Sequence, residues 1–280
     1  MAVVTVEQVK GRAAYKRFVE FPYLAYRDEP RWSPPLVAYE RGRLDPHHPY
    51  FDEGDGEFFV ARRDGAVAGR ICAHVARSGD PNGWFGFFDV VDDPEVGVAL
   101  VQRAAEWLRE QGCAAMTGPV AFPPEDEPGV LVDGFDVDGT TGRSWHPPWH
   151  AAHLEAAGLT RGDERRTWRL ATEPGPHPKP VSVRRVPIVG RFVDLRLLLP
   201  GVIAVPDLTP ARDSAVTLAR MARAHEWVGC TIITLEGDPA ARVPELLGAA
   251  KDAGYEWVIS PWSPDDAPPE TVHARFGAAL

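Results

Sequence analysis

The opening third of the chain alternates between strand-like and helix-like patterns of hydrophobic residues. Val3–Val9 alternates apolar and polar positions, as a half-buried strand does. Gly11–Asp28 instead carries apolar residues near helical spacing, which predicts a helix. A hairpin is expected next, because two strand-like segments, 57–62 and 66–74, flank the turn-forming pair Asp64-Gly65.

The segment after the hairpin predicts a strand followed directly by a helix. Gly83–Val91 is dense in aromatic residues, which is typical of a buried strand. Asp92 or Asp93 can cap the next helix. Pro94 suits the first turn of that helix, and Gly112 is expected to end it.

A proline-rich stretch divides the chain into two predicted domains. Four prolines among the nine residues of Thr172–Pro180 indicate a linker. We predict a first domain over 1–172, a linker over 173–180 and a smaller α/β domain over 181–280. The fold class is α/β, with a mixed sheet of the α+β kind. The other predicted elements are a short helix near 36–42, strands at 113–120, 130–132 and 165–171, a helix from 147 to 158, strands at 181–186 and 192–199, a helix at 210–227, a strand at 230–235, a helix at 240–253 and a strand at 256–260.

Composition narrows the class of protein. A formal net charge of −10 argues against DNA as an obligatory partner, since phosphate backbones bind basic surfaces. No run approaches the ~20 apolar residues of a membrane span, and the first residues lack a signal-peptide core. Cys72, Cys113 and Cys230 are scattered in apolar stretches, so no disulfide framework or metal site is expected. We expect a soluble cytoplasmic protein without a membrane partner.

Four segments carry the most specific signal in the sequence. They are FPYLAYRDEPRWSPPL (Phe21–Leu36), RDGAVAGRI (Arg63–Ile71), GFFDVVDDPEV (Gly86–Val96) and the stretch from GVLVDGFD to HPPWHAAHLEAAGL (Gly129–Leu159). They resemble a large bacterial group of proteins related to the Gcn5-related N-acetyltransferases (GNAT). The resemblance covers most of residues 1–170 and implies the GNAT acyltransferase fold there. It also implies acetyl-CoA or another acyl-CoA as donor, a small-molecule acceptor, and a tail that is a reduced second GNAT-like half.

In the GNAT fold, the strand matching Gly83–Val91 separates from its neighbour and opens a cleft. The resemblance implies that the backbone of Val90 and Val91 holds the thioester there. It places the CoA diphosphate at the N-terminus of the following helix, where free N–H groups and the helix dipole favour anions. The residues at that position are Val96, Gly97, Val98 and Ala99.

The predicted diphosphate site departs from the family loop in charge. Asp92 and Glu95 stand where the family carries Arg or Gln and a glycine, and Gly97 keeps the second glycine position. With Asp93, they put three negative charges where a diphosphate would dock. Each like-charge contact near 4 Å costs about 4 kcal/mol at an effective dielectric of ~20. In addition, Leu154 occupies the place of the tyrosine that many GNAT enzymes use as general acid.

Four residues are candidates for acid–base chemistry. His146 and His150 lie at the predicted start of a helix, where a histidine can act as a base near neutral pH. The alternative is a helix-cap region with partly exposed histidines. Glu125 belongs to an acidic loop that either covers the cleft or is solvated. Asp89 interrupts the aromatic strand, so its pKa should rise if it points into the cleft. The predicted substrate pocket is walled by Phe87, Trp145 and Trp149, although an aromatic strand is more often part of a core.

Three functions remain open from the sequence. The first is an N-acyltransferase that moves an acyl group from a CoA-type thioester to a small amine or amino acid. The second keeps acyl or aminoacyl transfer but takes the donor from an acyl carrier protein or an aminoacyl-tRNA, which avoids a diphosphate at Glu95. The third is a small-molecule-binding protein that keeps the fold without the chemistry.

Overall fold

A computed structural model of the chain describes residues 3–32, 35, 37–45, 47–122, 127, 129–139, 143–172, 186–188, 191–193, 202–204, 217–220, 229–232, 238–252 and 257–280. The helices are α1 (Gly11–Ala25), α2 (Val37–Arg43), α3 (Tyr50–Glu53), α4 (Pro94–Glu110), α5 (Trp149–Ala156) and α7 (Pro239–Asp252). The strands are β1 (Val4–Gln8), β2 (Gly54–Arg63), β3 (Ala66–Ala76), β4 (Asn82–Val90), β5 (Ala115–Gly118), β6 (Val130–Asp133), β7 (Thr160–Ala171), β8 (Val186–Ile188), β9 (Arg191–Val193), β10 (Val202–Ala204), β11 (Thr217–Arg220), β12 (Gly229–Ile232), β13 (Trp257–Ser260) and β14 (Thr271–Ala279).

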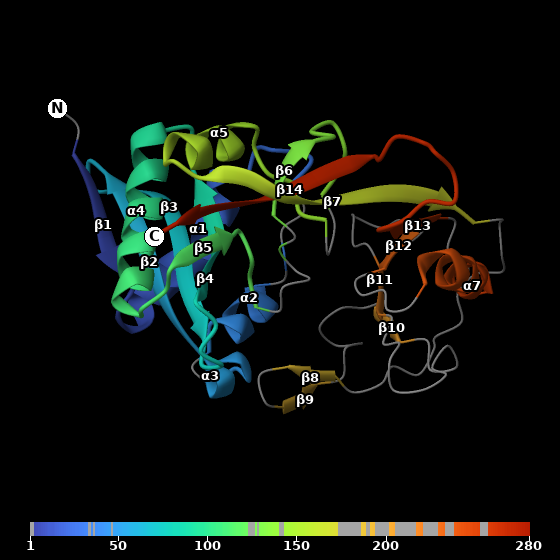
Figure 1. Cartoon of the computed structure of the whole chain (residues 1–280), viewed down its shortest axis with the longest axis horizontal. Helices are drawn as coiled ribbons and strands as arrows, with labels where there is room; N and C mark the ends of the chain where they lie inside the picture. Colours follow the sequence, from blue (N-terminus) through green and yellow to red (C-terminus); the bar gives the residue numbers. More distant parts are fainter. Residues whose placement is uncertain are drawn as a thin grey trace.

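Most strands form one continuous mixed sheet (Figure 1). Its order is β1-β2-β3-β4-β5-β14-β7-β13-β12-β11-β10, with β6 paired to β14 and a separate β8-β9 pair. β1 to β4 pair antiparallel, whereas β4 and β5 are parallel. β7 belongs to both halves, because its residues 160–167 pair with β14 and its residues 168–171 pair with β13.

The last strand of the chain completes the sheet of the first half. β14 lies between β5 and β7, where Phe276 pairs with Gly118 and Thr271 pairs with Thr167. Its alternate residues Val272, Ala274 and Phe276 are buried in the core. The tail therefore supplies a strand to the first half. The boundary at 172 stays a prediction, and the linker at 173–180 lies outside the described residues.

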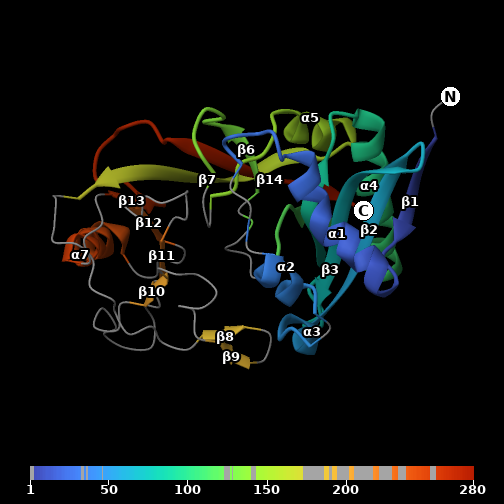
Figure 2. The ribbon, with the colours of Figure 1, turned by 180° about the vertical axis from the view of Figure 1, so that it is seen from behind.

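Helices cover both faces of the first-half sheet (Figures 1 and 2). α4 lies against β1, β2 and β3, with α5 beside it, and α1 lies against β3 and β4 on the opposite face. α4 buries a stripe at helical spacing, Val96, Leu100, Ala104 and Leu108, which explains why it packs on the sheet. On the other face, the Phe18 ring of α1 meets the Phe58 and Phe87 rings edge-on.

The elements predicted for the first half are present, whereas one prediction for the tail is wrong. A helix was expected over 210–227, yet its described residues, Thr217–Arg220, form β11 between β10 and β12. Sheet pairing thus overrides an Ala- and Arg-rich composition that favours a helix. Of the strands expected at 181–186 and 192–199, the structure describes only the residues that fall in β8 and β9.

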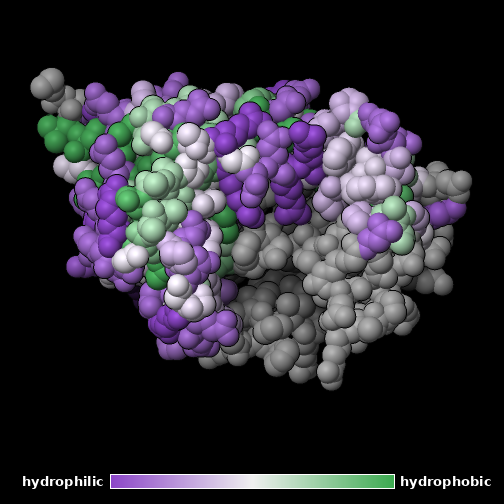
Figure 3. All heavy atoms as spheres, viewed as in Figure 1, coloured by the Kyte–Doolittle hydropathy of each residue, from purple (hydrophilic) through white to green (hydrophobic). Residues whose placement is uncertain are grey.

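The outer surface of β7 is strongly hydrophilic. Figure 3 shows polar side chains gathered where β7 and β14 run beside each other. Arg161 and Arg166 both pair with Glu164 there, at 2.7 and 3.1 Å. Within the described parts of the chain, no helix is long and apolar enough to cross a bilayer.

Candidate functional site

β4 runs on well beyond its pairing with β5. They pair only from Asn82 to Trp84, whereas β4 continues to Val90. One further bond, from the Val120 N–H to the carbonyl oxygen of Phe85 at 2.7 Å, closes the start of the gap. Past that bond, the Phe87 N–H of β4 contacts the side chain of Glu127, and the Val90 carbonyl oxygen contacts that of Trp149. The separation expected from the GNAT resemblance is therefore present.

A β-bulge at Phe87 changes the edge of β4 within this gap. The pairing register with β3 shifts between Arg70 and Cys72, and Phe87 has a φ of 53°. A left-handed backbone costs a bulky residue roughly 1–3 kcal/mol and is concentrated at functional sites. The Phe87 N–H donates to Oε2 of Glu127 at 2.9 Å. The bulge thus presents a main-chain donor to a buried carboxyl group.

Glu127 is the buried acid of the gap. Burial raises its pKa to about 7, an increase that the Phe87 N–H and the charge of Arg43 only partly offset. A group that titrates near pH 7 suits a general base at neutral pH. Sequence analysis located the acidic loop but singled out Glu125, which lies outside the described residues. The role of Glu125 stays a prediction.

Asp89 is half of a buried ion pair. Nε of Arg70 donates to its Oδ2 at 2.7 Å, and a second Arg70 N–H reaches the carbonyl oxygen of Phe18 at 3.0 Å. Burial raises the pKa of Asp89, but Arg70 and the neighbouring histidines outweigh it, so the pKa is lowered overall. The predicted rise in pKa is wrong. Asp89 remains ionised at neutral pH and acts as a fixed negative charge.

Tyr26, at the end of α1, brings a phenol to Asp89 and His150. Its oxygen lies 3.0 Å from Nε2 of His150, which is also 3.3 Å from the carbonyl oxygen of Val90. Burial, together with the charge and hydrogen bond of Asp89, raises the pKa of Tyr26 well above its ordinary value. Burial lowers the pKa of His150 to about 4. At neutral pH the phenol is therefore protonated and the imidazole is uncharged.

The hydrogen bonds around His150 determine which ring nitrogen carries the proton. A carbonyl oxygen only accepts, so Nε2 of the neutral ring carries the proton that faces Val90 and Tyr26. The Tyr26 hydroxyl then donates to Asp89. Nδ1 of His150 keeps its lone pair, and this buried atom has no hydrogen-bond partner among the described residues. The side chains of Tyr26, His150 and Asp89 thus form one hydrogen-bonded cluster, the proton-handling group.

Tyr26 was not identified from the sequence, because the family pattern places its tyrosine at Leu154. Leu154 lies in the hydrophobic core beside α4 instead. Tyr26 belongs to Phe21–Leu36, one of the four segments that carry the resemblance. Its place in that segment was the only available signal, since folding alone brings residue 26 next to residue 150.

Two of the three predicted aromatic residues, Trp145 and Trp149, lie beside the proton-handling group. Trp149 donates its Nε1–H to the carbonyl oxygen of Val90 at 2.9 Å. The Trp145 ring meets the Tyr26 ring edge-on, with centroids 6.5 Å apart. Phe87 packs in the aromatic core with α1, in agreement with the alternative interpretation of that strand. Its backbone, rather than its ring, is the part that faces the gap.

The candidate histidines are buried, so the alternative of partly exposed cap residues is wrong. His146 accepts a hydrogen bond at Nδ1 from the Leu131 N–H at 3.2 Å, and burial lowers its pKa to about 3. His146 and His150 lie side by side, with ring centroids 5.7 Å apart. Among the residues that the structure describes, no three His, Cys, Asp or Glu side chains are grouped to hold a metal ion.

The N-terminus of α4 is occupied by the protein's own acidic groups. Asp93 caps the helix: its Oδ1 accepts from the N–H groups of Glu95 and Val96 at 3.1 and 3.3 Å. Its carbonyl oxygen accepts from the Gly97 N–H at 3.1 Å. Arg63 donates to Asp93 at 2.7 Å and to Glu95 at 2.9 Å, so these charges are paired internally.

These contacts do not fit a diphosphate at the start of α4. The N–H groups that would bind it are already satisfied, and the cation beside them, Arg63, is shared by two carboxylates. Val91, predicted to hold the thioester, donates its N–H to the carbonyl oxygen of Ala68 at 3.0 Å. Val98 and Ala99 are half-buried in the same first turns of α4.

Gly97 has a packing role that does not involve a ligand. A Cβ at this position would lie 2.8 Å from the Cβ of His153 on α5, closer than side-chain carbons approach one another. We expect Gly97→Ala to lower the free energy of unfolding by about 1–3 kcal/mol, because α4 and α5 must move apart. Gly248→Ala on α7 is the matched control, since nothing lies within 4 Å of its Cβ. Urea unfolding that finds equal effects for the two variants would contradict this close packing.

Comparison with solved structures identifies the fold. A tandem GNAT protein from the clavulanic acid biosynthesis pathway covers 99% of this chain, and 98% of that protein is covered, with a TM-score of 0.59 at 14% identity. The chain therefore has the mixed α/β fold of the GNAT superfamily, as the four segments predicted. At this level of identity the likeness establishes the fold and leaves the reaction open.

Two curated proteins are similar in sequence. Protein YghO of Escherichia coli is 35% identical over 158 residues, which are 55% of this chain and 40% of that protein. The bacterial ceramide synthase of Caulobacter vibrioides is 31% identical over 192 residues, which are 66% of this chain and 50% of that protein. The chain thus spans half or less of the length of these relatives. No protein-family profile matches the sequence.

Proposed function

We propose that this chain catalyses N-acyl transfer in the gap between β4 and β5, where an amine attacks the carbonyl carbon of a thioester. The observation that carries the proposal is the bulged edge of β4. There, one main-chain donor, a carboxyl group that titrates near pH 7 and a protonated phenol lie around a separation between two strands. The GNAT fold supports the same class of reaction.

The reaction needs two proton transfers, and two groups suit them. The new C–N bond forms as the C–S bond breaks, so the amine must lose a proton and the leaving thiolate must gain one. Glu127 is assigned the first transfer, because its pKa of about 7 lets it accept a proton at neutral pH. Tyr26 is assigned the second, because its phenol is protonated at neutral pH, and a proton from water restores the phenol once the thiol has left.

The Phe87 N–H is the proposed donor to the oxygen of the thioester carbonyl. A main-chain N–H stabilises the charge that develops on this oxygen during attack. Glu127 occupies that N–H in the present arrangement, at 2.9 Å. We infer that the carboxylate gives up this bond when the thioester enters, which leaves it beside the attacking amine. Asp89 and Arg70 hold Tyr26 in place as an ion pair.

A carrier-protein thioester is the donor that these contacts favour over acyl-CoA. Asp93 satisfies the first N–H groups of α4, and Asp93 and Glu95 already share Arg63. A donor without a diphosphate at this helix avoids both obstacles. The acidic overall charge disfavours an aminoacyl-tRNA. For the acceptor, the name of the Caulobacter relative, a ceramide synthase, suggests an amine that carries an aliphatic chain.

The test measures both products of the transfer. The full chain is incubated with a long-chain amino alcohol and either an acyl-carrier-protein thioester or the matching acyl-CoA. Free thiol and N-acyl amide are then quantified. We expect equal amounts of thiol and amide, with the carrier-protein donor preferred. Thiol without amide, or no thiol from either donor, contradicts the proposal.

A further inference from the structure

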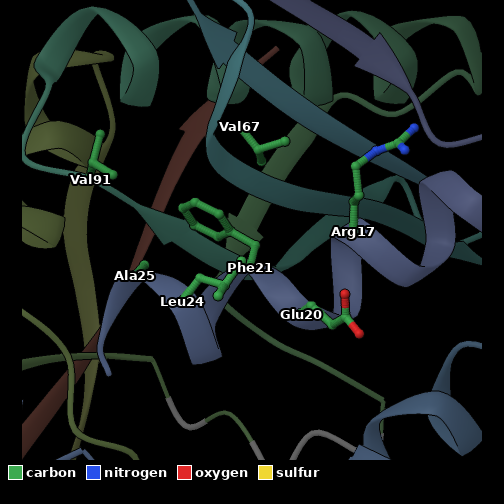
Figure 4. Close-up of a pocket in the computed structure, with 7 residues that line it drawn as sticks. All are labelled: Arg17, Glu20, Phe21, Leu24, Ala25, Val67 and Val91. Carbon is green, nitrogen blue, oxygen red and sulfur yellow. The ribbon is translucent and has the colours of Figure 1, made fainter. Parts of the chain in front are cut away.

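A groove runs between α1 and the sheet, next to the proposed catalytic group. It has a volume of about 360 Å³, which falls in the ~300–1,000 Å³ range of small-molecule sites. The groove is lined by Arg17, Glu20, Phe21, Leu24, Ala25, Val67 and Val91. Figure 4 shows the Phe21 ring directed from α1 toward Val67 of β3 and Val91, the residue after β4.

The lining of the groove is apolar except at one end. Leu24 is 66% exposed and borders the groove from α1. Val67 and Val91 are also in partial contact with solvent on the sheet side. The charged residues Arg17 and Glu20 lie on the side of the groove remote from Val91 and Ala25 (Figure 4). The groove is therefore apolar along most of its length and charged at one end.

The apolar end of the groove adjoins the proposed catalytic group through the backbone. Ala25 lines the groove and directly precedes Tyr26. Val91 lines it as well, and directly follows Val90, whose carbonyl oxygen accepts from Trp149 and lies 3.3 Å from Nε2 of His150. The apolar end of the groove therefore lies one residue along the chain from Tyr26 and from Val90, the residues that form the proposed catalytic group with His150.

We propose that this groove binds the aliphatic chain of a substrate, with the reacting amine or thioester end beside Tyr26 and the far end of the chain at Arg17 and Glu20. Bound hydrocarbon would cover the exposed Leu24 and the two valines. The identity of the reacting end rests on the proposed N-acyl transfer, whereas chain binding itself does not. The same chain chemistry can come from the acyl donor or from the amine, and the test separates the two.

Binding of the aliphatic chain is measured without turnover. A fluorescent fatty acid is bound to the full protein chain and displaced by saturated fatty acids and alkylamines of increasing length. We expect affinity to increase about fourfold per methylene, which corresponds to ~0.8 kcal/mol, until the groove is filled. An affinity independent of length overturns the proposal.

Two exposed aliphatic residues give a matched pair of variants. Leu24→Glu places a charge in the groove and should weaken probe binding about tenfold or more. Val3→Glu makes the same kind of change at a side chain that is 63% exposed but outside the groove, and should leave probe binding unchanged. Equal effects of both variants overturn the site. A Leu24→Glu variant that changes the oligomeric state with unaltered probe binding also overturns it, in favour of a contact between copies.

The source of the chain follows from steady-state kinetics. Leu24→Glu should raise KM for the substrate whose chain occupies the groove, with KM for the other substrate unchanged. Tyr26→Phe should abolish acyl transfer and keep probe binding intact. Probe binding by an inactive wild-type protein would therefore refute the proposed function alone, and activity without probe binding would refute the groove alone.

Discussion

Glu127→Gln is expected to lower the rate of acyl transfer by about 10²–10⁴-fold, the usual contribution of a general base. The wild-type rate should rise as the pH passes through about 7, because the carboxyl group must lose its proton before it can accept one from the amine. The variant should lose this inflection, since an amide does not titrate. The measurement is kcat/KM between pH 5 and 9.

The control for this prediction is Glu110→Gln. Glu110 lies at the end of α4 with its side chain 62% exposed, so its replacement should leave both rate and pH profile unchanged. The folded state of Glu127→Gln should be at least as stable as that of the wild type above pH 7. A carboxyl group with a raised pKa favours the folded state only while it is protonated, and this contribution is lost as pH rises through about 7. An unaltered inflection near pH 7 in Glu127→Gln would show that a group other than Glu127 accepts the proton of the amine.

Arg70→Met is expected to lower the free energy of unfolding at pH 7 by about 3–5 kcal/mol, because it leaves Asp89 buried without its cation. The loss should shrink in acid. In the wild type the lowered pKa of Asp89 contributes stability above the ordinary value of 3.8, and this contribution disappears as pH falls toward the folded-state pKa. Urea unfolding at pH 7 and at pH 3, below the ordinary pKa of 3.8, checks both points.

The matched control is Arg77→Met. Arg77 pairs with Asp55 at 2.6 Å, but both side chains are about half exposed, so water replaces the lost partner. We expect little change in stability at either pH. Similar losses for the Arg70 and Arg77 variants would mean that Asp89 is less desolvated than its position indicates. Arg70→Met with Asp89→Leu should recover part of the stability, since no unpaired charge then remains.

Local sequence patterns were sufficient for the first-half elements and insufficient for β14. The hairpin turn at Asp64-Gly65 and the Asp93 cap depend on neighbours in the chain, so the sequence alone predicts them. β14 contains His273 and Arg275 between its apolar residues and ends in small ones. Its pairing with β5 and β7 spans more than a hundred residues, and no local pattern announces such a contact.

In the candidate site, too, the residues with a local sequence signal were predicted and those placed by long-range contacts were missed. Asp89 and His150 were identified because a polar residue in an aromatic strand and a histidine at a helix start stand out locally. Tyr26 and Arg70 were missed, since their roles arise only when α1, β3 and α5 converge. The pKa of Asp89 was predicted in the wrong direction because the prediction counted burial without the Arg70 charge.

Because β14 lies between β5 and β7, the first half of the chain depends on the C-terminal segment to complete its sheet. A fragment that stops at residue 172 would leave β5 and β7 with bare hydrogen-bonding edges, and bare edges recruit strands from other molecules. Cleavage at the proline-rich stretch would therefore not release an independently folded first half. β14 would have to be supplied as a separate peptide that pairs with both β5 and β7.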